Sequence, residues 1–118
     1  MRTGGPKVAG IGDACESRAA DVLARRGYRI VARNVRAGGG EIDLVARDGD
    51  ELCFVEVRGR RTRRFGAPEE TVGTRKRAML RRAAEAYLAA HPGAAESGCR
   101  FDIVAITPDG VVILKDAF

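Results

Sequence analysis

The feature that most constrains the fold is a pair of β-forming runs that meet at Asp48-Gly49, within residues 41–60. An Asp-Gly pair between two such runs is a strong signal for a β-hairpin, because a tight turn needs residues that tolerate positive φ. With Asp48 and Gly49 at the centre of the turn, Arg47 faces Asp50 across the hairpin. The sequence therefore predicts two antiparallel strands in a defined register.

That register decides which side chains share a face. Facing residues lie on the same side of a hairpin, and each strand alternates with a period of two. Asp43 then faces Phe54 and Glu41 faces Glu56. The polar face holds Glu41, Asp43, Glu56 and Arg58. The opposite face is apolar and holds Ile42, Leu44, Cys53, Val55 and Val57. A slip of one residue would put Asp43 and Glu56 on different faces.

Three carboxylates on one face of a hairpin need a counter-charge, since like charges on neighbouring strands repel. A divalent cation would relieve that repulsion, because Mg²⁺ and Mn²⁺ prefer carboxylate oxygens. The structural alternative is a solvated polar face on which Arg58 pairs with an acid. Glu16, in a predicted helix, also has two interpretations. It completes a capping box with Asp13, or it lies on the inward stripe and leans toward the carboxylates.

The remaining patterns predict one α/β domain with the element order α-β-β-β-α-β-β. A length of 118 residues suits a single domain. We expect a flexible arm over residues 1–11 and one domain over residues 12–118. Besides the hairpin, the predicted elements are a helix from Asp13 to Gly27, a strand over 28–35, a helix from about Thr74 to His91, and strands over 101–106 and 111–115. One sheet with helices packed on it follows from this order.

Composition excludes several classes of protein. Apolar residues make up 45% of the chain, which argues against wholesale disorder. No apolar run approaches the roughly 20 residues of a membrane span, and the N-terminus lacks the shape of a signal peptide. We therefore expect a cytoplasmic protein without a membrane partner. Three separated cysteines and one histidine do not match zinc-finger spacing, and Cys53, inside an apolar run, is expected in the core.

Charge is distributed unevenly along the chain, which has a formal net charge of +5. Residues 58–100 hold eleven basic side chains and four acids, whereas residues 41–56 hold six acids and one base. A basic region beside an acidic cluster is typical of a site that binds polyanions. The structural alternative is ordinary surface charge. The predicted phosphate-contacting residues are Arg60, Arg61, Arg63, Arg64, Arg75 and Lys76. If the polyanion is the DNA that the family resemblance given below implies, the small number of aromatic residues available to stack bases favours duplex or branched DNA over single strands.

Three segments resemble the YraN family of small bacterial proteins: GDACESRAADVLARRGYRIVARN, GGGEIDLVARDGDELCFVEVRGRR and CRFDIVAITPDGVVILKDAF. That family is regarded as a distant relative of archaeal Holliday-junction resolvases in the PD-(D/E)xK nuclease superfamily. The resemblance implies a restriction-endonuclease-like three-layer core, a mixed sheet of about five strands flanked by helices, and, by analogy, a homodimer.

The resemblance also implies a catalytic set. Matched residue by residue, the superfamily pattern falls on Glu16, Asp43, Glu56 and Arg58, with Mg²⁺ or Mn²⁺ held by Asp43, Glu56 and Glu16. Arg58 stands where the superfamily usually has lysine. An arginine cannot act as a base, although it can position or stabilise charge.

Three functional hypotheses remain open at this point. The first is a metal-dependent endonuclease-like protein that hydrolyses phosphodiesters in duplex or branched DNA. The second is a catalytically inactive nucleic-acid-binding module on the same fold, with Arg58 as its signature. The third is a scaffold whose basic face binds an acidic protein.

Overall fold

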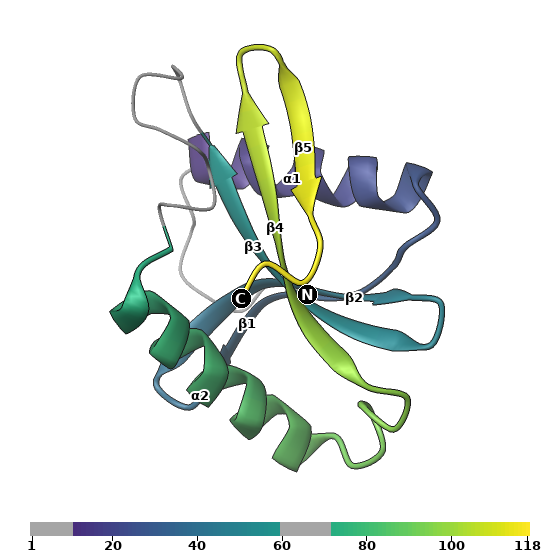
Figure 1. Cartoon of the computed structure of the whole chain (residues 1–118), viewed down its shortest axis with the longest axis vertical. Coiled ribbons are helices and arrows are strands. Elements are labelled where there is room, and N and C mark those ends of the chain that lie inside the picture. The colour runs from purple at the N-terminus through teal and green to yellow at the C-terminus, as the bar shows by residue number, and fades with distance from the viewer. Residues whose placement is uncertain (1–10, 60–71) are drawn as a thin grey trace.

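The computed structural model of the chain describes residues 11–59 and 72–118, with side chains from residue 14 onward. The predicted class and element order are confirmed (Figure 1). The predicted flexible arm lies outside the described residues except for Ile11, which belongs to the first helix. The elements are α1 (Ile11–Arg25), β1 (Arg29–Ala37), β2 (Gly40–Asp48), β3 (Glu51–Gly59), α2 (Thr74–Ala90), β4 (Cys99–Thr107) and β5 (Gly110–Leu114).

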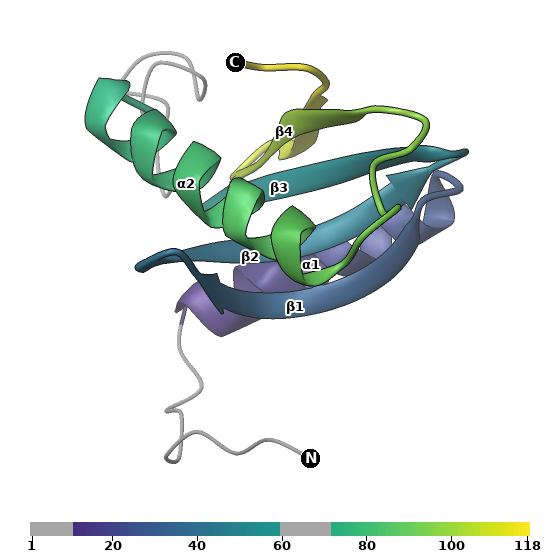
Figure 2. The ribbon, with the colours of Figure 1, turned by 90° about the horizontal axis from the view of Figure 1, so that it is seen from below.

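The five strands form one mixed sheet in the order β1-β2-β3-β4-β5. β3 and β4 are parallel, and every other neighbouring pair is antiparallel. The parallel step requires a crossover, which contains α2. α1 covers one face of the sheet and α2 the other, so the molecule has three layers (Figure 2).

Each helix buries an apolar stripe against its own face of the sheet. On α1 the buried residues are Ala19, Ala20 and Leu23, and on α2 they are Leu80, Ala83, Ala84 and Tyr87. The α1 side of the sheet contributes Leu44, Cys53, Val55 and Val104, and the α2 side contributes Val45, Phe54 and Ile103. Cys53 is a core residue as predicted, and burial is the main reason its thiol pKa rises to about 12. The sheet is therefore an apolar layer between two amphipathic helices.

The β2–β3 hairpin has a different register from the predicted one. Asp48 pairs with Glu51 and Leu44 pairs with Val55, so Gly49 and Asp50 form the turn. Gly49 has φ +63, a conformation that glycine adopts at low cost, and it takes the first central position of the turn. The predicted pairings of Asp43 with Phe54 and of Glu41 with Glu56 are wrong, because each facing partner moves by two residues. A shift of two preserves the alternation of faces.

One residue of the predicted apolar face lies on the other side of the sheet. Ile42 packs on the α2 side, whereas Leu44 packs on the α1 side. In the β1–β2 ladder, Arg33 pairs with Leu44 and Val35 with Ile42. Asn34, between those pairs, has φ +51. The strict alternation of β2 is therefore interrupted at Asp43, at the level of this left-handed residue.

The turn between β1 and β2 packs against α2. A Cβ on Gly38 would lie 2.7 Å from the carbonyl oxygen of Arg82, and Gly38 has φ +57. This close approach explains the need for glycine at a position predicted only as a flexible turn. Among the described residues, neither helix combines the length and apolar character needed to cross a membrane.

Candidate functional site

The Asp43 carboxylate lies where β2 and β3 separate. Ladder pairing between the two strands runs from the turn to Leu44 and Val55. Beyond that pair, the backbone N–H of Val57 donates a hydrogen bond of 2.9 Å to Asp43 Oδ2. The carboxylate thus accepts a bond that a backbone carbonyl would accept in a regular ladder. Asp43 is held in a fixed position beside β3.

Glu56 is the most buried acid of this region, with 4% of its side chain exposed. Burial and then the neighbouring Asp43 carboxylate raise its pKa to about 7. Lys76 and Arg58 oppose the rise by stabilising the charged form. Burial and Asp43 therefore disfavour the charged form of Glu56, and the nearby cations compensate only in part.

Two cations approach the same oxygen of Glu56. Arg58 Nη1 lies 3.3 Å from Glu56 Oε2, and Lys76 Nζ lies 3.4 Å from it. Arg58 comes from the same strand, whereas Lys76 comes from the first turn of α2. The pairing of Arg58 with an acid agrees with the structural alternative expected from the sequence. Lys76, predicted only as a phosphate contact, is a neighbour of the carboxylates.

A second pair of carboxylates is joined through Asn34. When its amide is oriented to satisfy the hydrogen bonds, Asn34 Nδ2 donates to Glu16 Oε1 at 2.9 Å and to Glu41 Oε2 at 3.3 Å. The side chain of Glu16 thus points toward β1 and β2. α1 begins at Ile11, so Asp13 lies inside the helix and not at its N-cap. Sequence reasoning missed Asn34, and its signal is that asparagine tolerates positive φ within a strand.

The carboxylates form two pairs and no cluster of three. Within residues 14–59 and 72–118, no three Asp, Glu, His or Cys side chains are grouped closely enough to hold one metal ion. The predicted ligand set of Asp43, Glu56 and Glu16 is therefore not assembled as one group. Asp43 and Glu56 alone fit a hard cation, because they supply adjacent oxygen ligands whose mutual repulsion a cation would remove.

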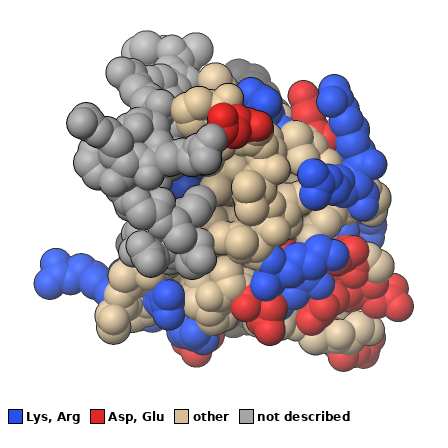
Figure 3. All heavy atoms as spheres, turned by 45° about the horizontal axis from the view of Figure 1, so that its top comes forward, with Lys and Arg blue, Asp and Glu red and all other residues tan. Residues whose placement is uncertain are grey.

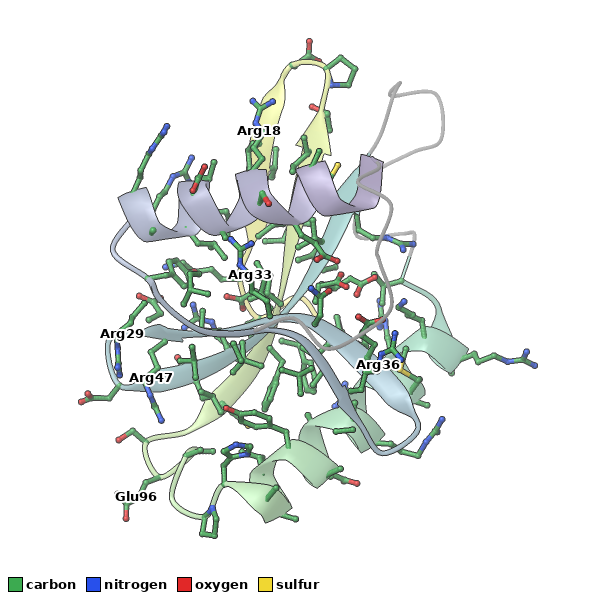
Figure 4. All side chains as sticks on the ribbon, turned by 180° about the vertical axis from the view of Figure 1, so that it is seen from behind. Arg18, Arg29, Arg33, Arg36, Arg47 and Glu96 are labelled. Carbon is green, nitrogen blue, oxygen red and sulfur yellow. The ribbon has the colours of Figure 1, made fainter. Side chains whose placement is uncertain are left out.

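Several predicted phosphate-contacting arginines, Arg60, Arg61, Arg63 and Arg64, lie outside the described residues. Arg75 is exposed at the start of α2. Further along this helix the guanidinium of Arg81 lies 5.4 Å from the centre of the Phe101 ring and contacts an aromatic pair instead of projecting freely. A basic set that sequence reasoning missed lies on α1 and β1: Arg18, Arg33 and Arg36, all exposed (Figure 4). They are scattered in sequence, so no basic run indicates them.

Comparison with solved structures finds a likeness to SSO0001, with a TM-score of 0.44 and 20% sequence identity. The match covers 90% of this chain and 50% of that chain. It supports no functional conclusion.

Sequence relatives are much closer. A protein of Moorella thermoacetica is 49% identical over 109 residues, covering 87% of this chain and 90% of its own length. The protein STH1475 of Symbiobacterium thermophilum is 51% identical over 98 residues, covering 83% and 82%. A protein of Burkholderia pseudomallei is 50% identical over 110 residues, covering 92% and 75%. All three are called UPF0102 proteins. The family model for UPF0102 matches residues 15–106. The chain therefore belongs to the uncharacterised protein family UPF0102, which is the YraN family that its motifs resemble.

Proposed function

We propose that this protein is a metal-dependent endonuclease-like protein that acts on duplex or branched DNA with Mg²⁺ or Mn²⁺. The observation that carries the proposal is the Asp43–Glu56 pair, in which two carboxyl groups are held together at the point where β2 and β3 separate. A fold gains no stability from forcing two acids together, and Glu56 loses solvation as well. Such an arrangement is common where a site is built for a cation or for catalysis.

Each residue has a defined part in this proposal. Asp43 and Glu56 would hold the metal through carboxylate oxygens, and a bound metal would supply an activated water and neutralise charge on the phosphoryl group. Glu16, linked through Asn34 to Glu41, adds negative charge from α1. Arg58 stabilises the additional negative charge that develops on the phosphoryl oxygens. Arg75 and the arginines of residues 60–64 contact the DNA backbone, so binding is sensitive to salt.

The test is cleavage of a labelled four-way junction and of the matching duplex, with Mg²⁺ or Mn²⁺, by wild type and Asp43→Asn. The asparagine keeps an oxygen that can accept the Val57 N–H, so the strands keep their connection. It removes the charge that holds a cation. We expect cleavage to fall by roughly 10²-fold or more, while the melting temperature does not fall, because Asp43→Asn removes a charge that disfavours ionised Glu56.

Arg29→Ala serves as the matched control, because Arg29 is an exposed residue at the start of β1 and has no part in the proposed site. Its cleavage rate should equal that of wild type. Equal rates in wild type and Asp43→Asn, or rates that do not depend on metal, would contradict the proposal.

A second candidate rests on Arg58. Since an arginine occupies the position where the superfamily usually has a lysine, the same fold without catalysis would still bind DNA. This candidate predicts salt-sensitive DNA binding by wild type and no cleavage by either wild type or Arg58→Lys. The third hypothesis, a scaffold for an acidic protein, predicts no DNA binding at low salt.

A further inference from the structure

We infer that Lys76 is the cation that leaves Glu56 when a divalent metal binds there, and that its freed ammonium then holds the scissile phosphate. This inference rests on the proposed function and assigns one of its steps to a residue of α2. Lys76 thereby becomes a catalytic residue of the site, because it contacts the reacting phosphate, and is no longer one of several backbone contacts.

The first observation is competition for one atom. Arg58 and Lys76 both approach Glu56 Oε2, at 3.3 Å and 3.4 Å. Asp43 Oδ2 already accepts the Val57 N–H, at 2.9 Å. A metal that binds Glu56 through either oxygen therefore lies close to two cations that already approach this carboxylate in the metal-free protein. At least one of the two cations must give way, because like charges repel at such short range.

The second observation separates the two cations. Arg58 is two residues from Glu56 on the same strand, and β3 is fixed in that region by pairing with β4. Its planar guanidinium has five N–H donors, so it can turn one edge away and keep another contact. Lys76 reaches the carboxylate with a single nitrogen at the end of a flexible stem, and 39% of its side chain is exposed. Lys76 is therefore the cation that departs completely.

The third observation is that only the side chain of Lys76 needs to move. The start of α2 is anchored: the backbone N–H of Arg77 donates to Gly73 at 2.9 Å, and Arg77 Nε donates to the Val72 carbonyl at 2.8 Å. Val72 itself is 2% exposed. The next turn is held by buried Leu80. The released ammonium consequently stays beside the Asp43–Glu56 pair, where a bound phosphate carries its charge.

The experiment compares Lys76→Ala with Arg75→Ala, a control that removes an exposed cation from the same helical turn. Metal affinity is measured first, by calorimetry with Mn²⁺ and without DNA. Removing Lys76 eliminates a competitor, so we expect Mn²⁺ to bind roughly three- to tenfold more tightly. Arg75→Ala should leave this affinity unchanged. A Lys76 that serves only as a structural ion pair would lower the melting temperature without tightening metal binding.

Cleavage is measured next, under single-turnover conditions. Lys76→Ala should lower the rate constant by roughly 10²-fold with a smaller effect on DNA affinity, whereas Arg75→Ala should chiefly weaken DNA binding. Arg29→Ala, at an exposed residue outside the proposed site, should leave the rate constant unchanged. Adding Arg58→Lys to Lys76→Ala returns an ammonium to the site from β3 and should restore part of the rate. Lys76→Gln repeats the test with most of the stem retained.

The outcomes separate the two proposals. Unchanged or weaker Mn²⁺ binding by both Lys76 variants overturns the inference, whether or not wild type cleaves DNA. Wild-type cleavage with an undiminished rate in both variants also overturns it. An absence of wild-type cleavage contradicts the proposed function and the phosphate-holding step, while tighter Mn²⁺ binding would still support the release of Lys76 from Glu56.

Discussion

Two clusters of charged side chains both include acids of β2 and β3, but these acids are stabilised in different ways. At the β2–β3 turn, Arg100 on β4 contacts three acids: Glu51 at 2.7 Å, Asp48 at 2.8 Å and Asp102 at 2.9 Å. Asp102 is fully buried and also accepts the backbone N–H of Asp116 at 2.9 Å. This cluster, the Arg100 network, surrounds its one arginine with acceptors.

The Asp43–Glu56 pair is arranged differently from the Arg100 network. Its acids face each other, and the two cations beside Glu56 meet on one oxygen at 3.3–3.4 Å, longer than the Arg100 contacts. The pKa values follow the geometry. Hydrogen bonds from Arg100 and Lys115 lower the pKa of Asp48, whereas burial and Asp43 raise that of Glu56 to about 7.

The position of the two clusters adds to this contrast. Acidic and basic side chains are interleaved over the side of the molecule where the β2–β3 turn lies (Figure 3). The start of α1, the end of β3 and the start of α2 all lie toward the other side (Figure 1). At one end of the sheet, Asp48, Glu51 and Asp102 are hydrogen-bonded to one arginine, and the pKa of Asp48 is lowered. At the other end, the pKa of Glu56 is raised although two cations contact it. Acids held by short hydrogen bonds to an arginine are a structural device, while a buried carboxyl group with a raised pKa is a reason to look for a ligand.

Of the substitutions that test this contrast, Arg100→Ala should have the largest effect on the free energy of unfolding. This change leaves Asp102 buried without its main counter-charge, so we expect a loss of about 3–5 kcal/mol of unfolding free energy. Urea denaturation at pH 7 measures the loss. Arg29→Ala, an exposed arginine, should change stability by less than about 0.5 kcal/mol. A loss for Arg100→Ala as small as that of the control would mean that the Arg100 network contributes no structural support.

Glu56→Gln, in contrast, should increase the free energy of unfolding at alkaline pH. The folded pKa of about 7 is above the usual value of 4.5, so folding favours the protonated carboxyl. Wild-type stability from this group is complete below pH 4.5 and is lost as the pH rises through 7. Glutamine is neutral at every pH. In metal-free buffer we therefore expect Glu56→Gln to exceed wild type by on the order of 1–3 kcal/mol at pH 8, and to match it near pH 4.

Denaturation curves at both pH values, with a chelator present, check this expectation. A Glu56→Gln variant that is less stable than wild type at pH 8 would show that the ion pairs with Arg58 and Lys76 outweigh the cost of burial and of Asp43.

The smallest effect is expected for Asp48→Asn, and its pH dependence has the opposite sign. The folded pKa of Asp48 is lowered by Arg100 and Lys115, so the charged form contributes stability above pH 3.8 that is lost as the pH falls through the folded pKa. Part of the group is exposed to solvent, which limits the loss for Asp48→Asn at pH 7 to about 0.5–1 kcal/mol. Near pH 2 the two proteins should converge. A loss that grows on acidification would contradict the assignment.

Local sequence patterns determined much of the fold. The Asp48-Gly49 pair, the helical spacing of Leu80, Ala83 and Tyr87, and the apolar β-forming runs were sufficient for the element order. These signals are local, because turn chemistry and amphipathic periodicity act within a few residues. The sequence also predicted that Asp43 and Glu56 lie on the same face of the hairpin. The predicted register was wrong by two residues, and a shift of two residues does not move a side chain to the other face.

The tertiary structure alone decided which charges from separate elements meet. Arg58 and Lys76 are 18 positions apart in the sequence, and no local pattern places both beside Glu56. Asn34 and Glu16 meet Glu41 only because α1 lies over β1 and β2. The position of Ile42 likewise depended on the left-handed Asn34 in the neighbouring strand. The periodicity of a sequence indicates which face of one helix or strand is buried. The pairing of charges depends on how separate elements pack against one another. The sequence therefore indicated the carboxylates, whereas the packing determined which charged groups contact them.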